Sequence, residues 1–206
     1  MSNDRAIAAL RRGLGSGLLF VVAGPSGAGK NSIIDRVLDN DPGLTFSISY
    51  TTRPRRDCET DGVDYIFVSH EAFNRLVDEG EFVEHVTYQG DQYGTSRSQI
   101  RCVISEGRDP ILNIDVEGAR SLQATGIPGC KVVYIFLVPS SLDRLAMRLR
   151  ARGTENEAEI AGRLQAAARE MDAVPLFDYL VINDDLDVAA HELSAIIAAE
   201  RLRILP

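Results

Sequence analysis

A lysine follows a glycine-rich segment near the N-terminus, GPSGAGK at residues 24–30. An apolar run at 18–23 precedes this segment, and apolar residues at helical spacing follow it. A strand, a glycine loop and a helix in this order are the context of a phosphate-binding loop, where backbone N–H groups and the helix N-terminus surround an anion. The alternative is a glycine-rich turn without a ligand, but Lys30 at this spacing favours phosphate binding.

The residue after Lys30 departs from the phosphate-loop pattern, which has Ser or Thr there to ligate Mg²⁺ through the hydroxyl. This chain has Asn31, followed by Ser32. An amide oxygen can bind Mg²⁺, but Asn is longer than Ser, and Mg²⁺ demands near-octahedral geometry at short range. Any contact of Asn31 with the metal is therefore expected to run through water, and its NH₂ group could instead donate to a phosphate oxygen.

Arginines at 53, 55 and 56 form the most basic stretch of an acidic chain with net charge −8. Such a run is often a solvated loop, but guanidinium groups also bind phosphate bidentately, and composition alone leaves both interpretations open. The net charge argues against broad binding of nucleic acid or anionic membranes.

The length of 206 residues fits one α/β domain with small inserted regions. Cys58, Cys102 and Cys130 lack metal-ligand spacing and are typical of a reducing compartment. We expect no signal peptide or membrane span, and hence a cytoplasmic protein. The sequence leaves the oligomeric state unknown.

Hydrophobic periodicity predicts alternating strands and helices, and hence a parallel sheet with helices on both faces. Asp115 ends one of the apolar strands, where a carboxylate would face the ligand crevice of such a sheet. The expected strands are 18–23, 45–50, 65–68, 82–88, 111–116, 132–138 and 179–183. Besides the helix that follows the phosphate loop directly, the expected helices are 70–79, 140–152, 157–171 and 188–202, and a short helix is expected before the loop at 6–12.

Six segments, in order, resemble the guanylate kinase family, and the resemblance covers residues 18–203. They are GPSGAGK at 24–30, FSISYTTRPRR at 46–56, EFVEHVTYQGDQYGTS at 81–96, IDVEGA at 114–119, RLRARGT at 148–154 and INDD at 182–185. The resemblance implies a P-loop NTPase-like fold. Its core would be residues 1–44 and 99–206, with a helical lid at about 148–170 and an inserted α+β GMP-binding region at 45–98.

The implied reaction is Mg²⁺-dependent transfer of the ATP γ-phosphoryl group to GMP or dGMP. The acceptor phosphate is already anionic, so no general base is needed, and catalysis is positioning and charge neutralisation. The implied ATP contacts are Gly24, Pro25, Ser26, Gly27, Ala28, Gly29, Lys30, Asn31 and Ser32, with Asn183 beside the adenine; Arg148, Arg152 and Arg163 of the lid would join Lys30 at the phosphates.

The resemblance also implies a GMP site. The phosphate would be held by Arg53, Arg56, Tyr65 and Tyr93; guanine would be read by Ser49, Glu84, Thr95 and Asp115, with Glu59 and Gly94 in the same region. Guanine offers adjacent N1–H and N2–H₂ donors that a carboxylate accepts together, whereas adenine lacks this pair. Glu84 would therefore discriminate strongly between the two bases.

The chain departs from the family pattern at Asn31, at Asn113, where an acidic residue is usual, and at Asp57-Cys58. One alternative is a ribose 1,5-bisphosphate phosphokinase, a family that also lacks the hydroxyl after the lysine but differs around Glu84. Another is a guanylate-kinase-like binding module with weakened catalysis. We rank the first lower because that family looks dissimilar around Glu84 and Asp115. We rank the second lower because a scaffold has no reason to retain Lys30, Arg53, Arg56 and Glu84.

Overall fold

The computed structural model describes residues 17–88, 90–153 and 156–203, without the side chains of Tyr88 and Arg152. The helix expected at 6–12 lies outside these residues. None of the described helices has the length and apolarity needed to cross a bilayer.

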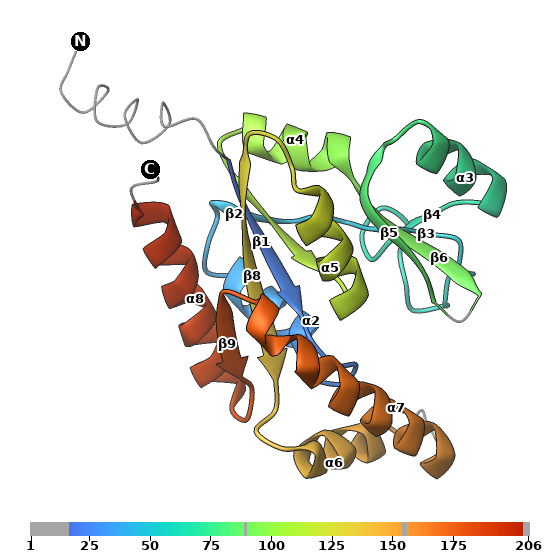
Figure 1. Cartoon of the computed structure of the whole chain (residues 1–206), viewed down its shortest axis with the longest axis vertical. Coiled ribbons are helices and arrows are strands. Elements are labelled where there is room, and N and C mark those ends of the chain that lie inside the picture. The colour runs from blue at the N-terminus through green and yellow to red at the C-terminus, as the bar shows by residue number, and fades with distance from the viewer. Residues whose placement is uncertain (1–16, 89, 154–155, 204–206) are drawn as a thin grey trace.

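The body of the protein is a five-stranded parallel sheet in the order β2-β7-β1-β8-β9 (Figure 1). The strands are β1 Gly17–Ala23, β2 Leu44–Phe46, β7 Asp109–Asn113, β8 Cys130–Val138 and β9 Tyr179–Ile182. Residues of β1 alternate between two buried faces, as expected for a strand covered on both sides. The predicted class, an α/β fold with a parallel sheet between helices, is confirmed.

Helices α2 Lys30–Leu38 and α8 Leu186–Leu202 cover one face, where they pack on Phe20 and Val22. Helices α4 Arg97–Ser105 and α5 Val116–Thr125 cover the other face through Leu19 and Val21. Neither α4 nor α5 was predicted from the sequence. With both faces covered, ligands can approach at the strand ends.

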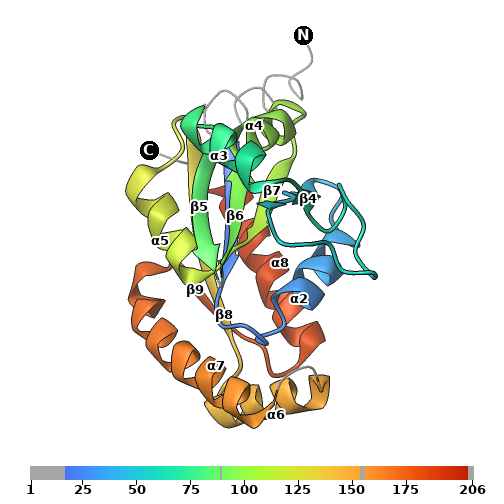
Figure 2. The same cartoon turned by 90° about the vertical axis from the view of Figure 1, so that its right-hand side faces the viewer.

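A second, four-stranded sheet in the order β4-β3-β6-β5 lies beside the main one (Figure 2). Its strands are β3 Tyr50–Thr51, β4 Ile66–Phe67, β5 Phe82–Tyr88 and β6 Asp91–Ser96. Helix α3 His70–Asp78 buries Phe73 against Phe82 of this sheet, with ring centroids 4.6 Å apart. The predicted strand over 45–50 was wrong as one element. Its start is β2 of the main sheet, and only its last residue belongs to β3, because the chain crosses between the sheets after Ser47.

Helices α6 Leu142–Arg152 and α7 Glu157–Glu170 lie at the carboxyl end of the main sheet (Figures 1 and 2). They pack against each other through Leu145, Leu149, Ile160 and Ala167. Asn156 and Glu159 form a capping box at the start of α7, which gives this helix a defined first turn. A 3₁₀ helix, η1 Met171–Leu176, leads back to β9.

The strand predicted over 111–116 was wrong at its carboxyl end. Strand β7 ends at Asn113, and Asp115 is the N-cap of α5, accepting from the Gly118 N–H at 2.6 Å. A carboxylate in this position satisfies an otherwise unpaired N–H of the first turn, which explains why the helix begins there. The other predicted strands and helices within the described residues agree with the structure apart from small shifts at their ends.

Candidate active site

The phosphate loop joins β1 to α2 and depends on glycine at two close approaches. Gly24 has φ 142°, and a Cβ there would lie 2.0 Å from the Leu137 carbonyl oxygen. Gly29, the left-handed N-cap of α2, has φ 91°, and a Cβ would lie 2.4 Å from Asn183 Nδ2. Since no side chain caps α2, its first N–H groups remain for an anion.

Lys30 points back along this loop. Its Nζ donates to the carbonyl oxygens of Gly24 at 2.5 Å and Pro25 at 3.1 Å. Burial lowers the pKa of Lys30 to about 8, against the opposing influence of Glu170 and Asp115. A bound phosphate would favour the charged ammonium further, so this site suits an anionic ligand.

The predicted lid contributes two described arginines to the loop. Arg163 of α7 donates to the Ser26 hydroxyl. Arg148 of α6 donates to the Ala28 carbonyl at 3.3 Å and to the Asp184 carbonyl at 3.4 Å. The predicted role of Arg152 falls on a side chain outside the described part.

Asn183, predicted beside adenine, follows β9 and is only 3% exposed. Its Nδ2 donates to the Ala28 carbonyl oxygen at 2.7 Å, while its Oδ1 has no hydrogen-bond partner among the described residues. The Asn183 side chain therefore supports the backbone of the phosphate loop, and its contact with adenine stays a prediction.

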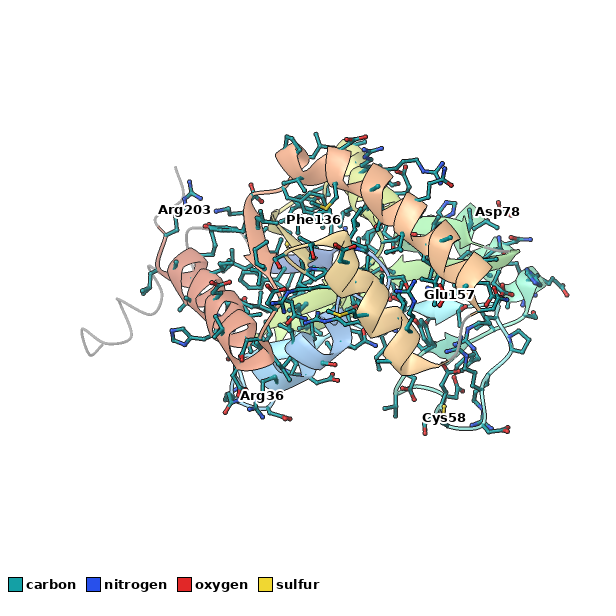
Figure 3. All side chains as sticks on the ribbon, turned by 90° about the horizontal axis from the view of Figure 1, so that it is seen from below. Arg36, Cys58, Asp78, Phe136, Glu157 and Arg203 are labelled. Atoms are coloured by element: carbon teal, nitrogen blue, oxygen red, sulfur yellow. The ribbon has the colours of Figure 1, made fainter. Side chains whose placement is uncertain are left out.

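The arginine-rich loop is organised around Glu59. Arg53 Nη2 donates to Glu59 Oε1 at 2.6 Å, and the Arg56 N–H donates to Glu59 Oε2 at 2.8 Å. Arg53 also stacks over the Tyr65 ring, 5.5 Å from its centroid. The Arg56 side chain remains exposed, as does Cys58, which lies on the side of the molecule away from α8 (Figure 3). Ordered Arg53 and exposed Arg56 together suit an anionic group.

Glu84 of β5 is a buried carboxylate, 5% exposed, at the join between the second sheet and α5. The Thr95 hydroxyl donates to its Oε1 at 2.5 Å. Gly118 permits the approach of Glu84 to α5, because a Cβ there would lie 2.9 Å from Glu84 Oε2. Burial and the nearby Asp115 raise the pKa of Glu84 to about 7. An acceptor pair held in this way fits two adjacent N–H donors.

The loop, the arginines and Glu84 all line one cleft. It consists of two adjoining cavities, one reaching Glu84 and Asp115, the other reaching Arg53, Arg56 and Arg148. Both cavities are lined by Ser26, Lys30, Ser49, Tyr65, Tyr93 and Asn113. Some predicted site residues are buried and do not line the cleft: Pro25 and Ala28 of the phosphate loop, Asn183 beside that loop, and Gly94 and Thr95 of β6.

The chain is similar to known proteins along most of its length. The family model described as guanylate kinase matches residues 16–200. The chain belongs to the guanylate kinase family. It is 42% identical to the guanylate kinase of Alkalilimnicola ehrlichii, over 91% of each chain, and 43% identical to that of Thermotoga maritima, over 91% of this chain and 89% of the relative. The crystal structure of guanylate kinase from Anaplasma phagocytophilum has a TM-score of 0.73 at 30% identity, covering 92% of this chain and 88% of that one.

Membership of the guanylate kinase family confirms the resemblance stated from the sequence. The chain is a kinase, and the matches do not favour the two alternatives, the ribose 1,5-bisphosphate phosphokinase and the non-catalytic module.

Sequence reasoning missed Glu170, which lines the cleft, and Gly118, which lies against Glu84. Glu170, at the end of α7, lies in the cavity with Lys30 and influences its pKa. No sequence signal marked Glu170. Gly118 lies within the quoted IDVEGA segment, where a glycine near a helix start could have indicated a close approach.

The residues beside Lys30 do not fit a protein-held Mg²⁺. Asn113 Nδ2 donates to Asn31 Oδ1, so one of the two lone pairs on the only cation-binding atom of Asn31 already accepts a hydrogen bond. Both side chains are neutral, and the described part of the chain contains no cluster of three or more His, Cys, Asp or Glu that could hold a metal. Family members with a hydroxyl and a carboxylate at these two positions would present a different donor set.

The raised pKa of Glu84 predicts a pH-dependent stability. The pKa of this carboxyl group is 4.5 in the unfolded chain and about 7 in the folded protein. Its protonation therefore stabilises the folded state fully below pH 4.5, and this contribution is lost as the pH rises through about 7. Glu84→Gln is neutral throughout, so its unfolding free energy relative to the wild type should increase by about 3 kcal/mol between about pH 5 and pH 8.5.

This change is measured by thermal or denaturant unfolding of both proteins at the two pH values. Glu79→Gln, at the exposed end of α3, is the control and should show no such trend. A constant difference between Glu84→Gln and the wild type would contradict the shifted pKa.

Proposed function

We propose that the protein transfers the γ-phosphoryl group of ATP to GMP or dGMP, giving ADP and GDP or dGDP. The supporting observation is that buried Glu84 and phosphate-loop Lys30 face one cleft. Such a cleft can hold a guanine base at one end and a nucleotide's phosphates at the other. The relatives described above are guanylate kinases, which is consistent with this reaction.

In the proposed reaction, guanine N1–H and N2–H₂ donate to the Glu84 carboxylate, beside Ser49 and Asp115. Arg53, Arg56, Tyr65 and Tyr93 hold the acceptor phosphate. An oxygen of this phosphate attacks the γ-phosphorus in line, and the bond from that phosphorus to the β–γ bridging oxygen of ATP breaks. The nucleophile needs no general base because it is already anionic, so the protein's contribution is alignment and charge.

Lys30, Arg148, Arg152 and Arg163 would neutralise the phosphates, and Gly24–Ser32 would surround those of ATP. The residues beside Lys30 do not form a metal site of their own, so Mg²⁺ would be held mainly by ATP and would supply further neutralisation of the phosphate charge. Closure of the lid, about 148–170, over the main sheet and the GMP region around the second sheet would exclude water and limit wasteful hydrolysis.

An assay of ADP formation with ATP, Mg²⁺ and GMP tests the proposal, run beside AMP and ribose 1,5-bisphosphate as acceptors. We expect turnover with GMP and not with AMP. Equal rates with AMP would overturn the guanine assignment, and a preference for ribose 1,5-bisphosphate would support the alternative kinase. Calorimetry with GMP adds a direct readout, because absence of binding would favour the non-catalytic module.

Arg56→Ala should raise the KM for GMP by about 10- to 100-fold, since it removes one charge-assisted contact with the acceptor phosphate. The KM for ATP should change little. Arg55→Ala is the matched control, because Arg55 is an exposed neighbour that donates to the Glu59 carbonyl and does not line the cleft. Equal effects of the two variants on GMP would indicate a general role of charge in the loop.

Two further proposals follow from composition. A cytoplasmic location is consistent with the cysteine usage, and the net charge of −8 does not favour nucleic acid or anionic membranes as partners. The expected partner is a small molecule, GMP.

A further inference from the structure

The two departures from the family pattern near the phosphate loop contact each other. Asn31 lies in the first turn of α2, directly after the loop, and Asn113 is the last residue of β7. Strands β1 and β7 pair in parallel, with Val22 opposite Asn113. This register places Asn113 beside the start of α2, where its Nδ2 donates to Asn31 Oδ1.

This hydrogen bond decides which edge of the Asn31 amide is left for a ligand. Its oxygen accepts from Asn113, whereas its NH₂ group carries two hydrogens that can be donated. Asn31 and Asn113 both line the cavity that also contains Lys30, Arg56 and Arg148. The same cavity is also lined by Asp35, Glu59 and Asp64, so the preference of Asn31 comes from its own exposed group: an NH₂ group can donate to an anion but cannot coordinate a cation.

We propose that Asn31 and Asn113 act as one unit, in which Asn113 positions the Asn31 amide so that its NH₂ group donates to a phosphate oxygen of ATP. Asn113 is thus a positioning residue. In this protein, N–H donors supply part of the phosphate binding that Mg²⁺ would supply in a protein with a hydroxyl and a carboxylate at these two positions. The protein consequently depends less on Mg²⁺ for binding ATP than a variant with a hydroxyl and a carboxylate at these positions. This inference rests on the proposed ATP site.

Replacing Asn113, the donor of the pair, with aspartate should reverse the direction of its hydrogen bond with Asn31. The carboxylate of Asn113→Asp can only accept a hydrogen bond, so Asn31 must turn its NH₂ group toward Asp and its oxygen toward the cleft. That rotation removes a donor to phosphate, and the substitution itself adds a carboxylate that attracts cations. In Asn31→Ser, by contrast, the amide NH₂ group is replaced by a shorter hydroxyl with a single hydrogen, and no charge is introduced.

The experiment measures ATP affinity by calorimetry, in EDTA and in excess Mg²⁺, for the wild type, Asn31→Ser, Asn113→Asp and the double variant. The quantity compared is the ratio of the two Kd values, the gain in affinity from Mg²⁺. Asn74→Asp, on the exposed face of α3 and away from the cleft, adds the same charge as Asn113→Asp and is the control. Unfolding temperatures of all proteins identify any variant that is merely unstable.

We expect Asn31→Ser to weaken ATP binding in EDTA by about tenfold, the size of one hydrogen bond to a charged group. The gain from Mg²⁺ should be about tenfold larger in the double variant than in the wild type. Asn113→Asp should lower ATP affinity in EDTA in the wild-type background but change it less once Asn31 is serine, because the two act through one amide.

A gain from Mg²⁺ in the double variant within about threefold of the wild-type gain would overturn the proposal, as would fully additive effects in EDTA. These results differ from failure of the ATP site itself, in which the wild type would bind no ATP under either condition. An effect of Asn74→Asp equal to that of Asn113→Asp would also overturn it, since net charge alone would then explain the change.

Discussion

Replacing Lys30 with methionine is expected to lower kcat/KM for ATP by about 10²- to 10³-fold, the scale of losing a charged group aimed at a transferring phosphate. Methionine retains an unbranched chain of similar length, so the glycine loop should remain packed. The ammonium that donates to the Gly24 and Pro25 carbonyl oxygens is lost. GMP binding, measured by calorimetry without ATP, should stay close to that of the wild type.

The low pKa of Lys30 supplies a second readout. In the free protein this pKa is about 8, so part of the population is neutral at slightly alkaline pH. Phosphates bound beside Lys30 favour its charged form, and ATP binding at about pH 8.5 should therefore take up a proton. Calorimetry in buffers of different ionisation enthalpy detects this uptake, which Lys30→Met should abolish. A loss of kcat/KM below about tenfold would show that Lys30 is not the main cation at the phosphates.

Glu84→Gln is expected to lower kcat/KM for GMP by about 10²- to 10³-fold while leaving the KM for ATP nearly unchanged. Thr95 donates to Oε1, so the amide oxygen of glutamine should keep that position. The NH₂ group then replaces Oε2, and a donor meets the donors of guanine. The effect is large because the glutamine NH₂ group and the guanine N–H group that faces it would both be buried without a hydrogen-bond acceptor.

The ADP assay with GMP and AMP as acceptors measures this change, and Glu79→Gln is again the control. Discrimination between GMP and AMP should collapse chiefly through the loss with GMP. If GMP turnover survives Glu84→Gln within about fivefold, Glu84 does not accept from guanine and the base must be read elsewhere in the cleft.

Features encoded by neighbouring residues could be predicted from the sequence. The phosphate loop is an example, because the glycines, Lys30 and the helix that follows are adjacent in the chain, and their geometry is set locally. The parallel sheet could also be predicted, since its strands are continuous apolar runs. The end of β7 was misread because an apolar run includes Ile114 and Val116, whereas the cap by Asp115 starts a helix there.

Contacts between distant residues were beyond the sequence alone. Asn31 and Asn113 could each be recognised as unusual, but their hydrogen bond depends on the register of β1 with β7. The position of Glu170 beside Lys30 depends on how α7 packs over the sheet end. The division of 45–50 between two sheets likewise depends on which strand each end finds as a partner.

The hydrogen bond from Asn183 to the Ala28 carbonyl has a consequence for biosynthesis. The phosphate loop leaves the ribosome early, but the side chain that supports its backbone is synthesised 155 residues later. A nascent chain that stops before β9 therefore lacks both this support and the edge strand beside β8. A ligand stabilises a fold only where its site is formed, so we expect nucleotide at the proposed ATP site to stabilise the growing chain fully only after β9 has emerged and paired.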